Sequence, residues 1–172
     1  MQLKAQNLGF SYSPGYWIFR HLQLQIESGQ KIALLGPSGC GKSTLAKVLA
    51  QFYQPQEGQI YLNQNNLPAK GFCPVQYIGQ NPEKMMNPRL KMAQVLQEAQ
   101  QNKAQVWEDF AIPTEWLNRY PRELSGGELQ RFAIARALAP GVQFVIADEI
   151  TTMLDAISQA QIWQLLNKQI ED

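Results

Sequence analysis

The feature that most limits what this chain can fold into is a glycine-rich run that reads Gly36-Pro37-Ser38-Gly39-Cys40-Gly41-Lys42-Ser43. The run fits the pattern G-x-x-x-x-G-K-[ST] at every defined position. Its glycines let backbone N–H groups curl around an anion, and a helix that starts where the run ends adds a favourable dipole. Lys42 is then expected to reach the β- and γ-phosphates of a nucleotide, and Ser43 to place its hydroxyl on Mg²⁺. The run therefore predicts a phosphate-binding loop.

The residues on both sides of this loop agree with the prediction. Before the loop, residues 31–35 are mostly apolar, which predicts a strand covered on both faces. After the loop, apolar residues recur at helical spacing, which predicts an amphipathic helix. These residues are Leu45, Val48, Leu49 and Phe52.

A second candidate site follows residues 143–147, another apolar run that predicts a strand covered on both faces. The run is followed at once by Asp148 and Glu149. A carboxylate at the C-terminal end of a buried strand, beside a phosphate loop, can hold Mg²⁺ through water. The adjacent Glu149 is then expected to polarise an attacking water as a general base.

A third candidate site is the start of the segment Leu124-Ser125-Gly126-Gly127-Glu128-Leu129-Gln130-Arg131. Apolar residues at Leu129, Phe132 and Ala133 predict that it opens an amphipathic helix. A helix cap needs only Ser125, whereas two glycines in the first turn cost helix stability. Exposed N–H groups and a serine donor at such a terminus are suited to a phosphate. The segment predicts a second anion-binding site.

The remaining periodicities indicate how these sites are connected. Alternation at Leu22, Leu24 and Ile26 predicts a half-buried strand, and residues 58–62 and 75–78 are shorter strand candidates. Helical spacing recurs over residues 92–99 and 156–170. A turn-rich piece around Trp116 lies between two prolines. Strands followed by strand–loop–helix, a helical insert and helix–strand–helix predict an α/β fold.

Composition excludes several other classes of protein. The 172 residues include 15 basic and 14 acidic ones, a net charge of +1, so no basic field attracts nucleic acid. Two cysteines are too few for a disulfide framework, and the apolar runs are much shorter than a membrane span. We expect a reduced cytosolic protein that a partner must hold if it works at a membrane.

With these three motifs in this order, the chain from Tyr12 onward resembles the nucleotide-binding subunit of an ABC transporter. The resemblance implies a P-loop NTPase fold of ABC type, with a mixed sheet core, an N-terminal antiparallel β part and a helical subdomain. By this resemblance, residues 1–172 form one ATPase domain. In this domain, residues 1–79 and 140–172 form the RecA-like core, and about residues 80–139 hold the Q-loop, the helical subdomain and the signature helix.

The resemblance also implies ATP and Mg²⁺ as cofactors and assigns a role to individual residues. Glu149 and Gln80 are catalytic, Asp155 contacts the partner subunit, and Tyr12 stacks on adenine. Tyr16, Trp17 and Phe19 crowd nearby, and the alternative is that any one of these aromatic residues belongs to the core instead. The ATP contacts are Tyr12, Gly36, Pro37, Ser38, Gly39, Cys40, Gly41, Lys42, Ser43, Thr44, Ser125, Gly126 and Gly127, and the metal contacts are Ser43, Gln80 and Asp148.

A finer resemblance is to the oligopeptide, dipeptide and nickel importer branch of that family. Its patterns are Gln80-Asn81-Pro82 with Met86-Asn87-Pro88, Tyr120-Pro121-Arg122-Glu123-Leu124, and Thr151-Thr152-Met153-Leu154-Asp155. This implies transmembrane permease subunits, a homodimer or a paired homologous ATPase subunit, an indirectly linked solute-binding protein, and no nucleic acid. It also implies a cytoplasmic location at the inner face of the membrane. Peptide, nickel or another small solute all stay open as the cargo.

Two departures from the family pattern bear on activity. Ile150 stands where the family usually has proline, which changes the stiffness of the loop after Glu149. The family also places a switch histidine beyond the next strand, whereas this chain ends at Asp172 and its one histidine, His21, reads as a surface residue. We therefore keep a fragment or truncated subunit that binds nucleotide without turnover as an alternative. A small P-loop kinase is a further alternative, although a kinase has no use for the Ser125-Gly126-Gly127 segment.

Overall fold

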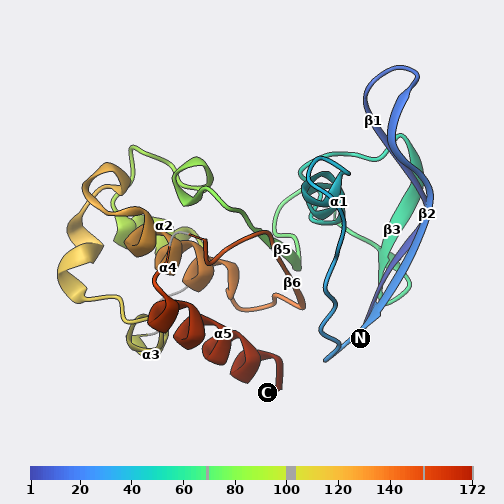
Figure 1. Ribbon diagram of the computed structural model, residues 1–172. Helices are drawn as coiled ribbons and strands as arrows, with labels where there is room; N and C mark the ends of the chain where they lie inside the picture. Colours follow the sequence, from blue (N-terminus) through green and yellow to red (C-terminus); the bar gives the residue numbers. More distant parts are fainter. Residues whose placement is uncertain (69, 100–103, 153, 172) are drawn as a thin grey trace. The chain divides into compact units, whose positions relative to one another are not determined.

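The chain is described by a computed structural model, shown in Figure 1, that covers residues 1–68, 70–99, 104–152 and 154–171. It divides into two units, Met1–Tyr77 and Ile78–Asp172. The elements that carry the candidate sites are shared between them. The phosphate-loop run belongs to the first unit, and Gln80, the signature segment and Asp148-Glu149 belong to the second.

The first unit contains an antiparallel sheet of four strands in the order β2-β1-β3-β4. Its strands are β1 (Gln2–Ser13), β2 (Tyr16–Glu27), β3 (Glu57–Leu62) and β4 (Asn65–Asn66). The predicted alternation along β2 is confirmed, because Leu22, Leu24 and Ile26 are half-buried while the residues between them are exposed. Gly15, at a φ of 84°, makes the tight turn between β1 and β2.

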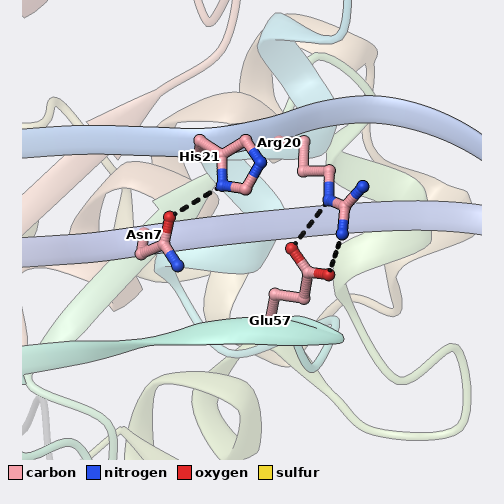
Figure 2. A network of polar contacts seen from close by, with 4 residues as sticks. All are labelled: Asn7, Arg20, His21 and Glu57. Atoms are coloured by element: carbon pink, nitrogen blue, oxygen red, sulfur yellow. Dashed lines mark hydrogen bonds and ion pairs between the residues drawn. The ribbon is translucent and has the colours of Figure 1, made fainter.

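The sheet carries two polar contacts that tie its strands together (Figure 2). The Arg20 guanidinium on β2 binds both carboxylate oxygens of Glu57 on β3, at 2.7 and 2.9 Å. His21 Nδ1 lies 3.0 Å from Asn7 Oδ1, and both residues have positive φ where the β1–β2 register shifts. The prediction that His21 is a surface residue is confirmed, since its side chain is exposed.

The prediction of a covered strand at residues 31–35 is wrong. These residues belong to no strand, and Ile32, Leu34 and Leu35 are 54%, 53% and 87% exposed. A covered apolar strand needs a neighbour on each side. Among the described residues, neither the sheet β2-β1-β3-β4 nor the pair β5-β6 includes this segment, so it has no strand beside it. The helix after the loop, α1 (Lys42–Leu49), is present as predicted, but Phe52 lies beyond its end and is exposed.

The second unit begins at Ile78, the last residue of β5 (Val75–Ile78). The elements that follow are mainly helical, with β6 near the C-terminal end. They are η1 (Pro82–Met85), α2 (Met92–Glu98), α3 (Ala104–Asp109), η2 (Thr114–Asn118), η3 (Pro121–Glu123), α4 (Gly126–Ala137), β6 (Phe144–Ala147) and α5 (Ala156–Glu171). The backbone N–H of Asp148, just after β6, donates to the carbonyl of Ile78 at 2.9 Å, so the carboxylate pair starts beside the end of β5.

One apolar core holds the second unit together. Met92, Leu96, Phe132 and Ile162 are among its fully buried members, and they come from α2, α4 and α5. The apolar periodicities predicted for these helices are therefore confirmed; the side chain of Ile170 and the residue Met153 lie outside the described part. The full coverage predicted for residues 143–147 is wrong, because β6 is only half-buried and its last residue is exposed. In the described part of the chain, no helix combines the length and apolar composition needed to cross a membrane.

Candidate functional site

The phosphate-loop run depends on glycine for its conformation. Gly39 and Gly41 have φ values of 81° and 100°, in the left-handed region that L side chains rarely adopt. A Cβ placed on Gly41 would lie 2.6 Å from Ile18 Cγ2, whereas one on Gly39 would meet nothing within 4 Å. Position 41 therefore requires glycine for two separate reasons, its backbone angle and the contact with β2.

The start of α1 is open to an anion. Gly41 is its N-cap residue and makes no side-chain cap, and the first turn contains no acidic residue. The first N–H groups of a helix have no intrahelical partners, and they carry the positive end of the helix dipole. The Lys42 ammonium donates to the carbonyls of Gly36 and Pro37, both at 2.8 Å, so this cation lies over the beginning of the loop. The exposed Ser43 hydroxyl follows it.

Tyr12 is linked to the same helix. Its hydroxyl lies 3.0 Å from Thr44 Oγ1, and its ring makes edge contacts with Phe10 and Tyr53, at centroid distances of 5.0 and 5.8 Å. The ring is nevertheless 60% exposed. Among its aromatic neighbours, Phe10 is buried, Phe19 packs against Phe10, and Tyr53 stacks on it. Tyr12 is thus a fixed but accessible ring beside the phosphate loop, which suits the stacking role predicted for it.

In the second unit, the structure brings together two side chains that are far apart in the sequence. Gln80 Nε2 donates to Glu149 Oε2 at 3.0 Å. Glu149 has a φ of 53°, an unusual value for a residue with a side chain. The turn is held by Thr152, whose N–H and hydroxyl both donate to the Glu149 carbonyl, at 3.3 and 3.1 Å. Ile150, 2% exposed, anchors it in the core. The carboxylate of Glu149 is therefore presented outward by a strained but well-anchored turn.

The side chains expected to hold Mg²⁺ have suitable chemistry. Mg²⁺ prefers oxygen ligands, and the set consists of a hydroxyl (Ser43), an amide oxygen (Gln80) and a carboxylate (Asp148). Gln80 uses its nitrogen in the bond to Glu149, which leaves the amide oxygen for a cation. Within the described residues, no group of three His, Cys, Asp or Glu side chains could hold a metal ion by itself.

The signature segment forms a capped helix start. Ser125 is the N-cap of α4, and its Oγ accepts the N–H of Glu128 at 3.3 Å. In return, Glu128 Oε2 accepts the N–H of Ser125 at 2.8 Å, which completes a capping box. Of the N–H groups expected to be exposed at this helix start, two are therefore occupied, that of Ser125 by the Glu128 carboxylate and that of Glu128 by the Ser125 hydroxyl. The Ser125 hydroxyl still has its proton to donate, since its oxygen is the acceptor in the cap.

An open pocket of about 540 Å³ lies at this helix start. It is lined by Trp116, Ser125, Gly126, Gly127, Glu128, Arg131, Leu154, Asp155 and Ser158. Asp155, which the resemblance assigned to a contact with the partner subunit, thus lies beside the signature segment of its own chain. The pocket has one long cationic side chain, Arg131, and an aromatic wall, Trp116.

Arg131 fixes one wall of this pocket, and sequence reasoning gave it no role. Its Nη1 donates to the Phe110 carbonyl at 3.1 Å and its Nη2 to Ser158 Oγ at 3.0 Å. The Ser158 hydroxyl donates to Asp155 Oδ2 at 2.7 Å. The only signal in the sequence was that Arg131 closes the signature segment. Its partners are set by how α4 packs against α5 and against the end of α3.

Asp155 also caps α5. Its Oδ1 accepts the N–H groups of Ile157 and Ser158, both at 3.0 Å. The hydrogen bond from the Ser158 hydroxyl, followed by these backbone bonds, holds the pKa of Asp155 below its usual value. The carboxylate is therefore ionised at neutral pH and committed to the turn.

Comparisons with known proteins show which family the chain is similar to. A model of the family described as ABC transporter matches residues 19–152. The chain is similar to the oligopeptide transport ATP-binding protein OppF of Bacillus subtilis, with 33% identity over 86% of this chain and 55% of that protein. It is similar to the nickel import system ATP-binding protein NikE of Staphylococcus aureus, with 31% identity over 97% of this chain and 74% of that protein.

A solved structure of the ATP-binding cassette MJ0796, a dimer in a post-hydrolysis state bound to ADP and Pi, is also similar. It has 25% identity and a TM-score of 0.82, and the match covers 98% of this chain and 83% of that one. The chain spans about half the length of the oligopeptide transport proteins that it matches. Since the family model covers most of the sequence, this likeness confirms the predicted P-loop fold of ABC type. The chain therefore belongs to the ABC transporter family.

Proposed function

We propose that this chain binds and hydrolyses ATP as the ATP-binding subunit of an importer for peptides, nickel or a related small solute. The similar proteins named for oligopeptide transport and nickel import support this class of cargo. The observation that carries the proposal is the hydrogen bond between Gln80 and Glu149, because it places a polar amide against a carboxylate suited to act as a general base.

The remaining site residues divide between binding and orientation. The N–H groups from Gly36 to Thr44 and the Lys42 ammonium bind the phosphates, while Tyr12 stacks on the base. Ser43, Gln80 and Asp148 hold Mg²⁺, which when bound neutralises charge on the phosphate oxygens. Glu149 accepts a proton from the attacking water, and Gln80 orients the Glu149 carboxylate. Kinship with the importer branch supports treating residues 1–79 and 140–172 as the core and about 80–139 as the inserted helical part.

The proposed assembly follows from the signature pocket. In a dimer of two copies, or of this chain and a homologous ATPase subunit, Ser125, Gly126 and Gly127 bind the γ-phosphate on the partner's loop. Asp155 lines the same pocket and contacts the partner. We further propose that transmembrane permease subunits hold the assembly at the inner face of the membrane, and that a solute-binding protein is linked through them.

The decisive experiment replaces Glu149 with glutamine, which is nearly isosteric but cannot accept the proton. The Glu149→Gln variant should bind ATP like the parent, as measured by titration calorimetry, and release no phosphate above background. Glu98→Gln is the matched control, because it makes the same chemical change at an exposed glutamate on α2 that has no role in the proposed site.

Three outcomes would contradict the proposal. Phosphate release at the parental rate in Glu149→Gln would show that Glu149 is not the base. ATP binding without phosphate release in the parent would leave a nucleotide-binding module. ATP consumption only when an acceptor other than water is added would indicate a kinase.

A further inference from the structure

The C-terminal end of α4 makes a hydrogen bond in which none of the candidate site residues takes part. Arg136 lies in the last turn of α4, and its Nη1 donates to the backbone carbonyl of Met85, the last residue of η1. Both residues are half-buried. A hydrogen bond from a guanidinium is charge-assisted and therefore stronger than an ordinary side-chain bond. Arg136 thus fixes the backbone of η1 to the helix that begins at the signature segment.

Met85 passes this restraint on. Its thioether Sδ accepts the backbone N–H of Gly79 at 3.0 Å. Gly79 is buried and directly precedes Gln80, whose side chain is exposed. The residue held by Arg136 at its carbonyl therefore holds, through its side chain, the peptide unit from which Gln80 extends.

The side chains around this connection are closely packed. Met86, next to Met85, is buried in the same core as Ile78 and Phe132 of α4. A shift of η1 would therefore have to displace core side chains, and close-packed cores resist such changes. The contacts form a connected series: Arg136 donates to the Met85 carbonyl, Gly79 donates to the Met85 thioether, and Gln80, which follows Gly79, donates to Glu149.

We propose that Arg136 is a positioning residue that sets the hydrogen bond between Gln80 and Glu149 through the backbone and thioether of Met85. The proposal rests on the proposed function only in taking this pair as the catalytic one. Helix α4 carries the signature segment at its N-terminal end. Through Arg136 at its C-terminal end, the same helix also determines the geometry of the general base, Glu149.

A simpler role for Arg136 has to be separated from this one. A cation in the last turn of a helix is favourable to the helix dipole wherever its side chain points. The Arg136→Met variant keeps the length of the stem and removes the donors and the charge. The Met85→Leu variant keeps the charge on Arg136 and the volume of the side chain, and removes only the sulfur acceptor. The Arg136→Lys variant keeps a charged donor and should rescue most of the effect.

The readout is the side-chain NH₂ signal pair of Gln80 in a ¹H–¹⁵N spectrum of the full chain, assigned by its disappearance in Gln80→Ala. Glu149→Gln marks the position of the pair when the bond to a charged carboxylate is lost. We expect Arg136→Met and Met85→Leu to move the pair toward that position, and Arg136→Lys to return it toward the parent. Arg122→Met is the control, since Arg122 is exposed and stacks on Tyr120. It should leave the pair unmoved.

Kinetics provide a second readout. Arg136→Met should lower kcat for ATP about 10- to 100-fold while KM changes little, because misplacing a reacting group acts on the transition state. In a Gln80→Ala background the same substitution should have no further effect on kcat, as expected when two residues act through one another.

An unmoved Gln80 pair in a folded Arg136→Met variant would overturn the inference. If that variant fails to fold, the Met85→Leu variant takes its place, and an unmoved Gln80 pair in Met85→Leu would likewise overturn the inference. The spectra contain no nucleotide, so a chain that failed to hydrolyse ATP would refute the proposed function while leaving this inference to be judged on the signals alone.

Discussion

The Gly41→Ala substitution tests whether the phosphate loop is built as the structure describes. Alanine at a positive φ costs about 1–2 kcal/mol because its Cβ crowds the following carbonyl. Gly39→Ala has this cost alone, since its φ is 81° and a Cβ there meets nothing within 4 Å. Gly41 has a φ of 100°, and its added Cβ would in addition lie 2.6 Å from Ile18 Cγ2.

The contact with Ile18 adds a second cost. Ile18 is β-branched, so its Cγ2 cannot swing away without leaving its preferred rotamer. Overpacking of this kind costs about 1–3 kcal/mol. We therefore expect Gly39→Ala to lower the free energy of unfolding by about 1–2 kcal/mol. Gly41→Ala should lower it by about 2–5 kcal/mol, the sum of the two effects.

The assay is urea unfolding followed by far-ultraviolet circular dichroism, on the parent and on each variant. Ile18→Ala removes the atom that clashes, so the double variant with Gly41→Ala should recover the steric part of the loss and keep the conformational part. Equal losses for Gly39→Ala and Gly41→Ala, or a double variant that recovers nothing, would refute this reasoning.

Three further predictions concern the other site residues. Lys42→Ala should lower ATP affinity at least tenfold in titration calorimetry, because the phosphate oxygens lose their mobile cation; unchanged affinity would contradict the phosphate-loop assignment. Ile150→Pro should destabilise the chain more than Ile150→Ala, which alone costs about 2–5 kcal/mol. A proline at position 150 also disfavours helical angles at the residue before it, which is Glu149 with its φ of 53°. Equal urea midpoints for the two variants would contradict this prediction. For Asp155, whose folded pKa is lowered, the stabilisation is complete above the unfolded pKa and disappears as the pH falls through the folded one. The urea midpoint of the parent should therefore fall more steeply in acid than that of Asp155→Asn, and parallel curves would contradict the cap.

Local patterns predicted most of the secondary structure because they record which face of an element is buried. Residues 75–78 form β5, and the apolar positions of α2 and α4 are buried as their spacing indicated. Residues 31–35 show the limit of such a pattern. An apolar run indicates that a segment favours burial, but a strand also needs neighbours to accept its hydrogen bonds. In the described part of the chain, this segment lies beside no strand of either sheet.

The sequence by itself determined the family and the chemistry of each half of the site, because loops and helix termini that bind phosphate are built from adjacent residues. The glycines of the phosphate loop, Lys42, and the cap at Ser125 all belong to this local class. Only the tertiary structure decided which distant side chains meet. The bond between Gln80 and Glu149 depends on the meeting of the ends of β5 and β6, where the Asp148 N–H donates to the Ile78 carbonyl. The link from Arg131 through Ser158 to Asp155 and the contact of Arg136 with Met85 depend on how α4 packs against α5 and η1. Spacing along a chain cannot specify such contacts, because they are set by the burial of apolar faces and not by neighbouring residues.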